Sequence, residues 1–326
     1  MEIICLGELL IDMFPAEVGK AMAEVSAFHP KPGGAPANAA VAAARLGFQS
    51  GFIGKVGDDI FGHLLERVLR EEGVNTRGIQ FDTDARTTLV FIAMPDVHNA
   101  EFVFYRNPGA DMLLKPEELP EDLLHATLCL HFGSLSLSNE PINSAVMRAI
   151  ELTRQGGGLV SFDVNYRPAL WASPEAATQR VKQVLPLVDL VKVNEKEMEL
   201  ITGDDDLHRG SQALLAYGPQ VCVVTLGADG SYFNTGVDAE FIPGFEVETI
   251  DSTGCGDAFI AGLLTQVVSQ DRSLSGIPST QMCSALRYAN AVGALTALKQ
   301  GVIPALPTRE QVENFLSQQP NNNRTN

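Results

Sequence analysis

The sequence predicts an α/β fold: a doubly wound, mostly parallel β-sheet flanked by helices, with a small β-sheet lid. Two observations favour it. From residue 119 onward, short apolar runs alternate with segments of helical periodicity, which is typical of parallel strands joined by helices. Between residues 82 and 106 the apolar residues instead recur with a period of two, which is typical of an antiparallel hairpin.

Length and composition are those of one large globular domain. The chain has 326 residues, of which 45% are hydrophobic and 19% charged. We expect a single domain over residues 1–318, with lid segments at about 12–32 and 84–107, and a disordered tail at 319–326. The net charge of −17 argues against nucleic acid or an anionic membrane as the main partner.

The five cysteines are far apart and form no C-x-x-C pair, which is typical of reduced thiols in a cytoplasmic protein. No apolar run approaches the roughly 18 residues that span a bilayer. The apolar first 13 residues contain acidic side chains and lack a basic start, so we interpret them as a strand and not as a signal peptide.

The first third of the chain begins with a buried strand at residues 3–6. A helix follows within 33–47, because proline stands in its first turn and glycine after its last periodic residue. A strand at 50–56 then leads to a helix that Asp58 caps and Gly73 ends. The alternating segments 87–94 and 101–106 form the hairpin, and together with 12–32 they are expected to make the lid.

In the rest of the chain, expected strands alternate with expected helices. The expected strands are 127–132, 159–163, 187–193 and 221–226. The expected helices are 140–155, 174–185, 195–202, 210–217, 278–299 and 308–316.

Polar side chains stand where the expected strands end. Because ligands of such sheets bind beyond the carboxyl ends of the strands, one cleft can collect these side chains. They are Asp12, Asp163, Asn165, Arg167, Asn194, Glu195, Glu197 and Thr225, the last of which is followed by the turn glycines Gly227 and Gly230.

The segment 251–262 reads DSTGCGDAFIAG, a glycine loop that opens into a helix near Asp257. The free N–H groups of such a helix start bind anions. A carboxylate there suits a base that takes a proton from a nucleophile attacking a phosphate. The structural alternative is a glycine turn whose acid merely favours the helix dipole, and the motif alone leaves the two readings about even.

A second glycine pair, Gly33-Gly34, precedes an alanine-rich helix, and Asn38 is the one polar residue inside the small-residue surface of that helix. Taken alone, Asn38 is more often a cap or a solvent-facing residue. The glycine pair in front of it favours the approach of a ligand.

Several motifs are missing, which excludes the site classes that they define. The chain has no G-x-x-x-x-G-K-[ST], no G-x-G-x-x-G, no H-E-x-x-H and no G-x-S-x-G. No lysine or arginine occurs between Arg209 and Arg272. A phosphate at the 254–256 loop must therefore rely on backbone N–H groups, a metal, and distant basic residues such as Arg167 or Lys192.

In these residues, the chain resembles the ribokinase/PfkB family of carbohydrate kinases, and within it the fructokinases, over nearly all of residues 1–318. The resemblance rests on Gly33-Gly34-x-x-x-Asn38, on Asn194-x-x-Glu197 and on Asp251-x-Thr253-Gly254-x-Gly256-Asp257. Residues 104–114 (FYRNPGADMLL) and 162–171 (FDVNYRPALW) are similar to fructokinases in particular.

The resemblance implies a ribokinase-like fold and ATP-dependent phosphorylation of a sugar, most simply at O6 of fructose, with Mg²⁺. Asp257 matches the catalytic base, and Gly254, Cys255 and Gly256 match the anion hole. The matching sugar contacts are Asp12, Gly33, Gly34, Asn38 and, from the lid, Arg106, with Asn165 and Arg167 as further candidates. The matching nucleotide, magnesium and phosphate positions are Lys192, Asn194, Glu197, Thr225, Gly227, Gly230 and Asn290.

Asp251 and Thr253, with backbone carbonyls around residues 296–305, match the potassium site of some members, and a homodimer through the lid is a further expectation. Two other functions stay open at this point. One is a kinase for another substrate, such as 2-keto-3-deoxygluconate, a ribonucleoside or aminoimidazole riboside. The other is a catalytically silent sugar-binding protein.

Overall fold

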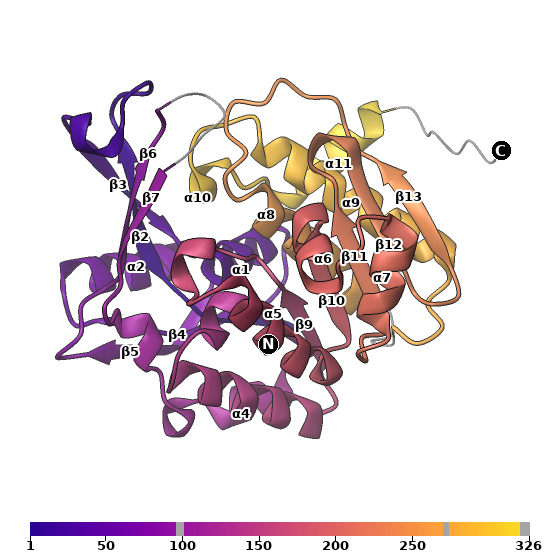
Figure 1. The fold of residues 1–326 in the computed structure, drawn as a ribbon, viewed down its shortest axis with the longest axis horizontal. Coiled ribbons are helices and arrows are strands. Elements are labelled where there is room, and N and C mark those ends of the chain that lie inside the picture. Colours follow the sequence, from indigo (N-terminus) through magenta and orange to yellow (C-terminus); the bar gives the residue numbers. More distant parts are fainter. Residues whose placement is uncertain (96–100, 270–273, 320–326) are drawn as a thin grey trace.

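The computed structural model describes residues 1–95, 101–269 and 274–319. Within these residues nine strands form the main sheet (Figure 1). Their order across the sheet is β13 (Ala239–Pro243), β12 (Gly230–Asn234), β11 (Val221–Thr225), β10 (Leu190–Asn194), β9 (Leu159–Asp163), β8 (Cys129–Gly133), β1 (Ile3–Leu6), β4 (Ser50–Gly57) and β5 (Asn75–Asp82). The strands from β11 to β5 pair in parallel, and β12 and β13 add an antiparallel hairpin at one edge.

Both faces of the main sheet are covered because its side chains alternate between two hydrophobic cores. In β1, Ile3 and Cys5 belong to one core and Ile4 and Leu6 to the other. The first core is covered by α1 (Ala35–Arg45), α2 (Ile60–Glu71), α8 (Cys255–Ser269), α9 (Ser279–Thr296), α10 (Val302–Ala305) and α11 (Arg309–Gln318). The second is covered by α3 (Glu121–Ala126), α4 (Ile142–Gln155), α5 (Pro174–Val184), α6 (Glu195–Thr202) and α7 (Leu207–Leu215).

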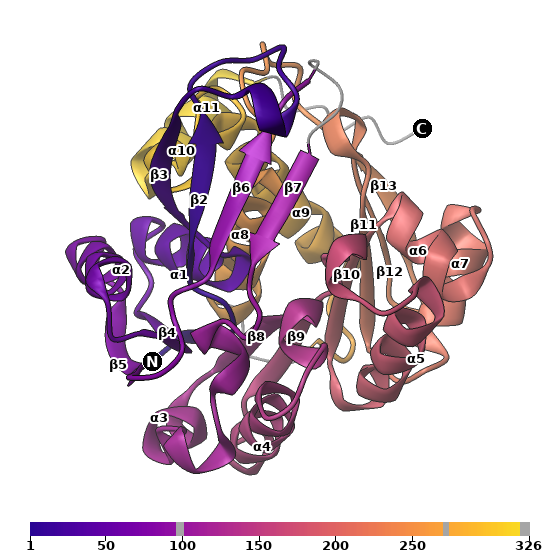
Figure 2. The same ribbon diagram turned by 60° about the vertical axis from the view of Figure 1, so that its left-hand side comes forward.

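A second sheet stands beside the main one. In the described residues it contains four strands, in the order β3 (Phe28–Gly33), β2 (Leu10–Pro15), β6 (Leu89–Ala93) and β7 (Glu101–Tyr105), and Figure 2 shows them side by side. We call it the small sheet. It follows directly from the end of β1, through Gly7 at φ 152.

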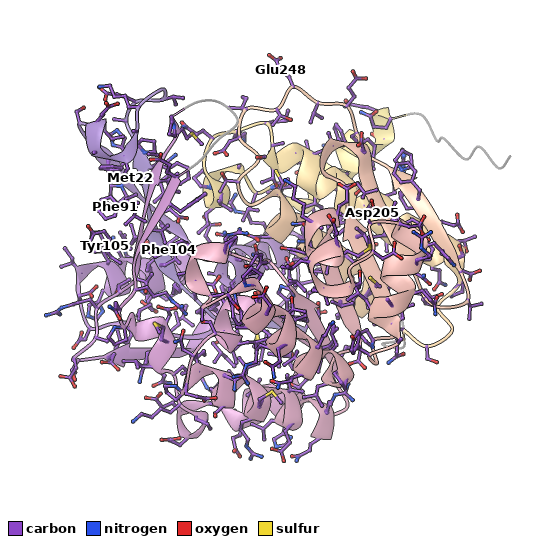
Figure 3. The ribbon with its side chains drawn as sticks, in the orientation of Figure 1. Met22, Phe91, Phe104, Tyr105, Asp205 and Glu248 are labelled. Atoms are coloured by element: carbon purple, nitrogen blue, oxygen red, sulfur yellow. The ribbon has the colours of Figure 1, made fainter. Side chains whose placement is uncertain are left out.

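The two faces of the small sheet differ. Asp12 pairs with Val90, and Val90 pairs with Phe104, so these three side chains share one face. Figure 3 places Phe104 on the side toward the main body and Phe91 and Tyr105 on the outer side. The inner face therefore carries a carboxylate among apolar side chains.

The predicted doubly wound, mostly parallel sheet with a smaller sheet beside it is confirmed. Most predicted elements agree with the structure to within a few residues, and 195–202 is reproduced as α6. The turn of the predicted hairpin, at 96–100, and the predicted tail beyond Gln319 lie outside the described residues.

Three local predictions were wrong or incomplete. The cap of α2 is Asp59 and not Asp58, because Asp59 Oδ1 accepts hydrogen bonds from Phe61 N at 3.0 Å and Gly62 N at 2.9 Å. Asp58 instead contacts His63. The edge strands β5 and β13, and β12 next to β13, were missed, since polar residues, glycine or proline interrupt their apolar patterns. Helix α8 begins at Cys255, so Asp257 lies inside its first turn.

Candidate active site

The candidate site lies where the parallel strands of the main sheet end and two helices begin. A Cβ added at Gly7, just after β1, would lie 2.7 Å from Pro36 Cγ in the first turn of α1. A Cβ added at Gly256, in the first turn of α8, would lie 3.2 Å from Lys192 Nζ near the end of β10. Both helix starts are thus packed against the carboxyl ends of strands, which is where sheets of this kind bind ligands.

The loop before α8 has room only for glycine at one position. Gly254 has φ 78, and a Cβ there would lie 2.2 Å from Val302 Cγ1. Cys255 N donates to Ser252 O, which tightens the turn before the helix. Because the first N–H groups of a helix have no acceptor within it, this turn presents backbone donors at the positive end of the α8 dipole.

Asp257 and Asn38 meet between the two helix starts. Asn38 Nδ2 donates a hydrogen bond to Asp257 Oδ2 at 2.9 Å, and both residues are buried. The alanines of α1 and Ala258 and Ala261 of α8 leave the two helices close enough for this contact. Burial raises the pKa of Asp257 to about 6, while the bond from Asn38 lowers it.

The oxygen of the Asn38 amide has no partner among the described residues although it is buried. An orphaned acceptor at this depth costs free energy unless a ligand supplies a donor. A hydroxyl group is a donor of the right kind.

Asp12 reaches the same site from the small sheet. Burial, followed by the charge of Asp257, raises the pKa of Asp12 to about 7, and Arg167 opposes this shift. A Cβ added at Gly33 would lie 2.1 Å from Asp12 Oδ2, so the bare glycine makes room for the carboxylate. Gly34 has φ 111, and a Cβ there would lie 2.4 Å from Glu8 O. Asp12, Asn38 and Asp257 therefore come together from β2, α1 and α8.

Two cations border these carboxylates. Lys192 is buried, and its Nζ lies 2.8 Å from Asp163 Oδ2 and 3.0 Å from Asp163 Oδ1. Arg167 is exposed at the start of a short 3₁₀ helix, Pro168–Leu170, and its charge lowers the pKa of both Asp12 and Asp257. The distant basic residues that the sequence analysis named are thus both at the site.

The turn between β9 and Arg167 is unusual at Asn165, which has φ 37 in the left-handed region. The next residue is fixed from helix α6, which follows the neighbouring strand β10, because Tyr166 N donates to Glu197 Oε1 at 2.7 Å. Such a conformation persists only when its surroundings impose it, and it directs the chain from β9 back across the end of β10.

Asn194 and Glu197 form the capping box of α6. Glu197 N donates to Asn194 Oδ1 at 2.9 Å and Asn194 N donates to Glu197 Oε2 at 2.8 Å. Burial raises the pKa of Glu197, with Lys192 opposing the shift. Both side chains are therefore held rigidly beside Lys192, whatever else they bind.

A second group of predicted residues gathers around the β12–β13 hairpin. Gly230 has φ 121, and a Cβ there would lie 2.2 Å from Ile242 O. Asn290 of α9 donates to Ile242 O and to Pro243 O, each at 3.2 Å. Thr225 at the end of β11 donates to Val193 O, and Gly227 at φ 61 begins the turn that follows. These residues border the strands β10 and β11, next to the end that carries Lys192 and Asn194.

Arg106 belongs to a different cluster, at the base of the small sheet. Its Nε donates to Asp111 Oδ2 at 2.6 Å, and both side chains are buried. Thr88 Oγ1 also donates to Asp111, at 2.5 Å. The charge of Arg106 lowers the pKa of Glu8, which burial raises to about 7. The structure thus ties Arg106 to Asp111 and Glu8, and its contact with a sugar stays a prediction.

Asp251 braces the glycine loop. Its Oδ1 accepts from Thr253 N and its Oδ2 from Gly301 N, each at 2.9 Å. These bonds hold the loop against the start of α10 and leave further lone pairs on each oxygen. Burial, followed by the charges of Asp251 and Asp257, raises the pKa of the Cys255 thiol to about 12, so this side chain is no nucleophile at neutral pH.

Sequence reasoning assigned no function to Asp163 or Glu8. Asp163 was visible as one of the polar residues at strand ends, but its pairing with Lys192 depends on the register of β9 and β10. Glu8 follows β1 and accepts a hydrogen bond from Ala35 N at 3.0 Å at the start of α1. Nothing in its sequence context separates it from a surface glutamate.

The arrangement has the parts that a phosphoryl transfer to an alcohol needs. A carboxylate with a raised pKa can accept a proton, backbone donors and a buried lysine can neutralise phosphate charge, and polar side chains can orient hydroxyls. The model of the pfkB family carbohydrate kinases matches residues 1–309 of this chain.

This chain belongs to the pfkB family of carbohydrate kinases.

Among pfkB relatives, "Probable fructokinase-2" of Arabidopsis thaliana is 42% identical over 316 residues, covering 96% of this chain and 95% of the relative. "Fructokinase-2" of Solanum lycopersicum is also 42% identical, with the same coverage. A fructokinase of Xylella fastidiosa, solved with bound ATP, is 33% identical and superimposes with a TM-score of 0.89, covering 97% of this chain and 98% of that one.

Two further solved structures bear on the substrate. A fructokinase of Vibrio cholerae O395, in a form with fructose, ADP and a calcium ion, has a TM-score of 0.87 at 33% identity, covering 97% and 98% of the two chains. The aminoimidazole riboside kinase of Salmonella enterica has a TM-score of 0.83 at 28% identity, covering 98% and 100%. Proteins of this fold are thus named as kinases of more than one acceptor.

The residues of the site fit a nucleotide phosphate. Gly256 has no side chain on the side where Lys192 Nζ approaches, and the first turn of α8 offers its backbone donors there. For a divalent metal, the described residues contain no cluster of three or more histidine, cysteine or acidic side chains. That donor set fits a divalent cation held mainly by phosphate oxygens and water, with Asn194 and Glu197 of the α6 capping box as the side chains that would border it.

No helix within residues 1–95, 101–269 and 274–319 has the length and apolar character that crossing a bilayer demands.

Proposed function

We propose that this protein is an ATP-dependent fructokinase that transfers the γ-phosphoryl group of ATP to O6 of D-fructose. The observation that carries the proposal is the contact between Asn38 and Asp257 at the start of α8, one turn from a glycine loop that Lys192 approaches. A proton acceptor and a phosphate site are adjacent there, and in-line transfer requires that adjacency.

The preference for fructose rests on the relatives. The curated proteins of about 42% identity are named fructokinases, and the Vibrio cholerae enzyme was solved with fructose and ADP. A kinase for 2-keto-3-deoxygluconate, a ribonucleoside or aminoimidazole riboside is the second candidate, supported by the lower likeness to aminoimidazole riboside kinase. A silent sugar-binding protein would have no need for a carboxylate whose pKa is raised to about 6.

In this mechanism Asp257 is the general base. Its carboxylate accepts the proton of the attacking hydroxyl as the new O–P bond forms, and the bond from the γ-phosphorus to the bridging oxygen of ADP breaks. A base with a pKa near 6 is mainly ionised at pH 7 and still basic enough to help, an effect of about 10²–10⁴-fold.

Asp12 and Asn38 hold the other hydroxyls of the sugar, with Gly33 and Gly34 allowing its close approach. The orphaned Asn38 oxygen accepts one hydroxyl, and the Asp12 carboxylate accepts others. A substrate without those hydroxyls would leave buried polar groups unpaired, which is how such a site discriminates. Arg106, Asn165 and Arg167 are further candidates for sugar contacts from the rim.

The phosphates occupy the first turn of α8 in this proposal. The N–H groups of Gly254 and Gly256 and the ammonium of Lys192 bind the γ-phosphoryl group, whose charge is redistributed in the transition state, and the Cys255 N–H joins them by sharing its hydrogen bond to Ser252 O. Thr225, Gly227, Gly230 and Asn290 border the rest of the nucleotide. Mg²⁺, near Asn194 and Glu197, would neutralise phosphate charge when bound. Potassium at Asp251 and Thr253 would support the loop from behind.

The small sheet acts as a lid in this proposal. It carries Asp12 on its inner face. Closing the sheet over the site would therefore move Asp12 onto the sugar and exclude water in the same step. Its edge strand β7 exposes Phe102, Val103 and Tyr105, which supports a homodimer formed through the lid. The five free cysteines support a cytoplasmic location.

The test is a panel of acceptors with coupled detection of ADP, run on the purified protein with Mg²⁺ and ATP. Fructose is expected to give the highest kcat/KM, and the product is expected to carry phosphate on O6. An Asp257→Asn variant supplies the background rate. Faster turnover with 2-keto-3-deoxygluconate or a riboside would replace the proposed substrate, and no ADP with any acceptor would refute the kinase.

A further inference from the structure

Lys192 lies at the start of α8, where its Nζ approaches Gly256. Lys192 is a buried cation beside the positive end of a helix dipole, where a cation is electrostatically disfavoured. Such a placement is stable only if negative charge compensates it. Asp163 is the carboxylate in direct contact with Lys192, with Oδ2 at 2.8 Å and Oδ1 at 3.0 Å from Nζ.

We propose that Asp163 is a positioning residue for phosphoryl transfer: its carboxylate holds the Lys192 ammonium in place, charged and directed at the phosphate site formed by the first turn of α8. This inference rests on the proposed function and adds to it a residue to which no role has been given. Asp163 would touch neither sugar nor nucleotide and would act through Lys192.

The sheet itself sets the geometry of the pair. Asp163 and Lys192 are directly paired residues on the adjacent parallel strands β9 and β10, so their side chains leave the sheet on the same face. That face is the one covered by α8, because Leu190, two residues before Lys192, belongs to the same core as Ala258 and Ile260. Neither side chain can turn away without breaking the packing around it, and this fixes Nζ over Gly256.

The neighbouring His131 and Ser161 do not compete with Lys192 for the Asp163 carboxylate. Behind it on the same face, His131 Nδ1 and Ser161 Oγ form a hydrogen bond of 3.1 Å. Burial lowers the pKa of His131 to about 4, so the imidazole is neutral at pH 7 and does not compete for the carboxylate. Burial also acts on Lys192, but Asp163, then Glu197 and Asp257, hold its pKa above the ordinary value.

Fold stability does not account for the pair. Burying two charges costs several kcal/mol in desolvation, and apolar side chains in their place are often as stable or more so. The other buried positions of β10 are leucine and valine, so the strand could carry another apolar residue at 192. A pair retained at this cost, next to a glycine that admits an anion, indicates a role in phosphate binding.

The first experiment compares Asp163→Asn with Asp189→Asn. Asp189 is a matched control, because it is a largely buried carboxylate that directly precedes β10, at the opposite end of the strand from the site around Lys192, and accepts from Val160 N at 2.8 Å. Asp163→Asn is expected to lower kcat about 10-fold or more while KM for the sugar changes by less than about threefold. Asp189→Asn is expected to lower thermal stability without this split between kcat and KM.

The pH profile distinguishes positioning from mere support. Burial lowers the pKa of Lys192, and Asp163 is the first of the charges that raise it. We therefore expect the pKa of Lys192 to fall in Asp163→Asn, so that activity is lost at a lower pH on the alkaline side. Asp163→Glu keeps the charge and is expected to restore the alkaline limb. An alkaline limb unmoved in Asp163→Asn would overturn the proposal.

A double-variant cycle tests whether Asp163 acts through Lys192. In a Lys192→Met background, Asp163→Asn is expected to lower kcat by no more than about twofold, because the group it positions is gone. Full additivity of the two losses would overturn the inference. If Asp163→Asn fails to fold, Asp163→Ser takes its place, and an alkaline limb of kcat that does not move in that variant overturns the inference.

A measurement without turnover separates this inference from the proposed fructokinase activity. Titration of ¹⁵N-lysine-labelled protein follows the Lys192 ammonium directly, and calorimetry with ADP follows phosphate binding. A lowered Lys192 pKa and weaker ADP binding in Asp163→Asn support the positioning role even if fructose is not the acceptor. An unchanged Lys192 pKa in Asp163→Asn contradicts the positioning role, even if fructose is the acceptor.

Discussion

Asn38 and Asp257 are separated by 219 residues of sequence, and their side chains form a buried hydrogen bond of 2.9 Å. The bond joins the first turns of α1 and α8, the two helices that begin beside the ends of the parallel strands. Asn38, in the alanine-rich helix α1, is thus the hydrogen-bond donor to Asp257, a carboxylate whose pKa is raised.

Replacing the carboxylate tests the base most directly. We expect Asp257→Asn to lower kcat by at least about 10²-fold, since the amide cannot accept the proton of the attacking hydroxyl. The change is nearly isosteric and leaves the α8 donors in place, so the dissociation constant of ADP, measured by calorimetry, is expected to stay within experimental error. Near-normal turnover would remove Asp257 from this role.

The pH dependence should follow the same contact. The base works while ionised, so its contribution is present above the pKa of Asp257, about 6, and is lost as the pH falls through that value. The bond from Asn38 favours the ionised form. We therefore expect Asn38→Ala to raise the pKa of Asp257 and move the acid limb of kcat to higher pH.

Asn290→Ala is the matched control for that shift. It also removes a buried amide from a helix, but its hydrogen bonds go to Ile242 O and Pro243 O. Its acid limb is expected to coincide with that of the wild type. An equal displacement in both variants would mean that general loosening, and not the Asn38 contact, sets the pKa of the base.

The glycine loop offers a comparison at constant backbone angle. Gly254 and Gly203 both have φ 78, but a Cβ meets Val302 at the first and nothing within 4 Å at the second. Gly203→Ala is expected to cost about 1–2 kcal/mol of unfolding free energy from the backbone alone. Gly254→Ala adds an overpacking cost of about 1–3 kcal/mol and displaces the loop, so turnover should fall as well.

Urea unfolding and steady-state kinetics of the two variants check this prediction. Equal stability losses and equal kcat values would show that the crowding at Val302 relaxes without moving the phosphate loop.

The buried pair of Arg106 and Asp111 tests a predicted sugar contact. Asp111→Asn leaves the arginine charge buried without its partner, so we expect a loss of about 3–5 kcal/mol in unfolding free energy. Replacing both residues by leucine is expected to cost less. If Arg106 also contacts the sugar, the double variant should be folded but have a raised KM for the sugar, and an unchanged KM would confine Arg106 to support of the small sheet.

The sequence analysis found most of the main sheet because its central strands are buried on both faces and read as apolar runs. It missed β5, whose pattern mixes Arg77, Gln80 and Asp82 with apolar residues, because that strand exists through its pairing with β4 at the sheet edge. It chose Asp58 over Asp59 as a cap, since neighbouring acids differ only in which one the backbone directs to the helix start. Strand pairing and the direction of a capping side chain depend on the folded backbone, and a local sequence pattern does not determine them.

The chain's own order of residues was enough to establish the α/β class, the glycine loop before Asp257 and the glycine pair before Asn38, because these depend on local periodicity and on backbone freedom. Only the tertiary structure decided that Asn38 bonds Asp257, that Asp12 reaches them from another sheet and that Asp163 holds Lys192 at the start of α8. These contacts join residues far apart in sequence, and they form when helix packing and strand register bring buried charges together.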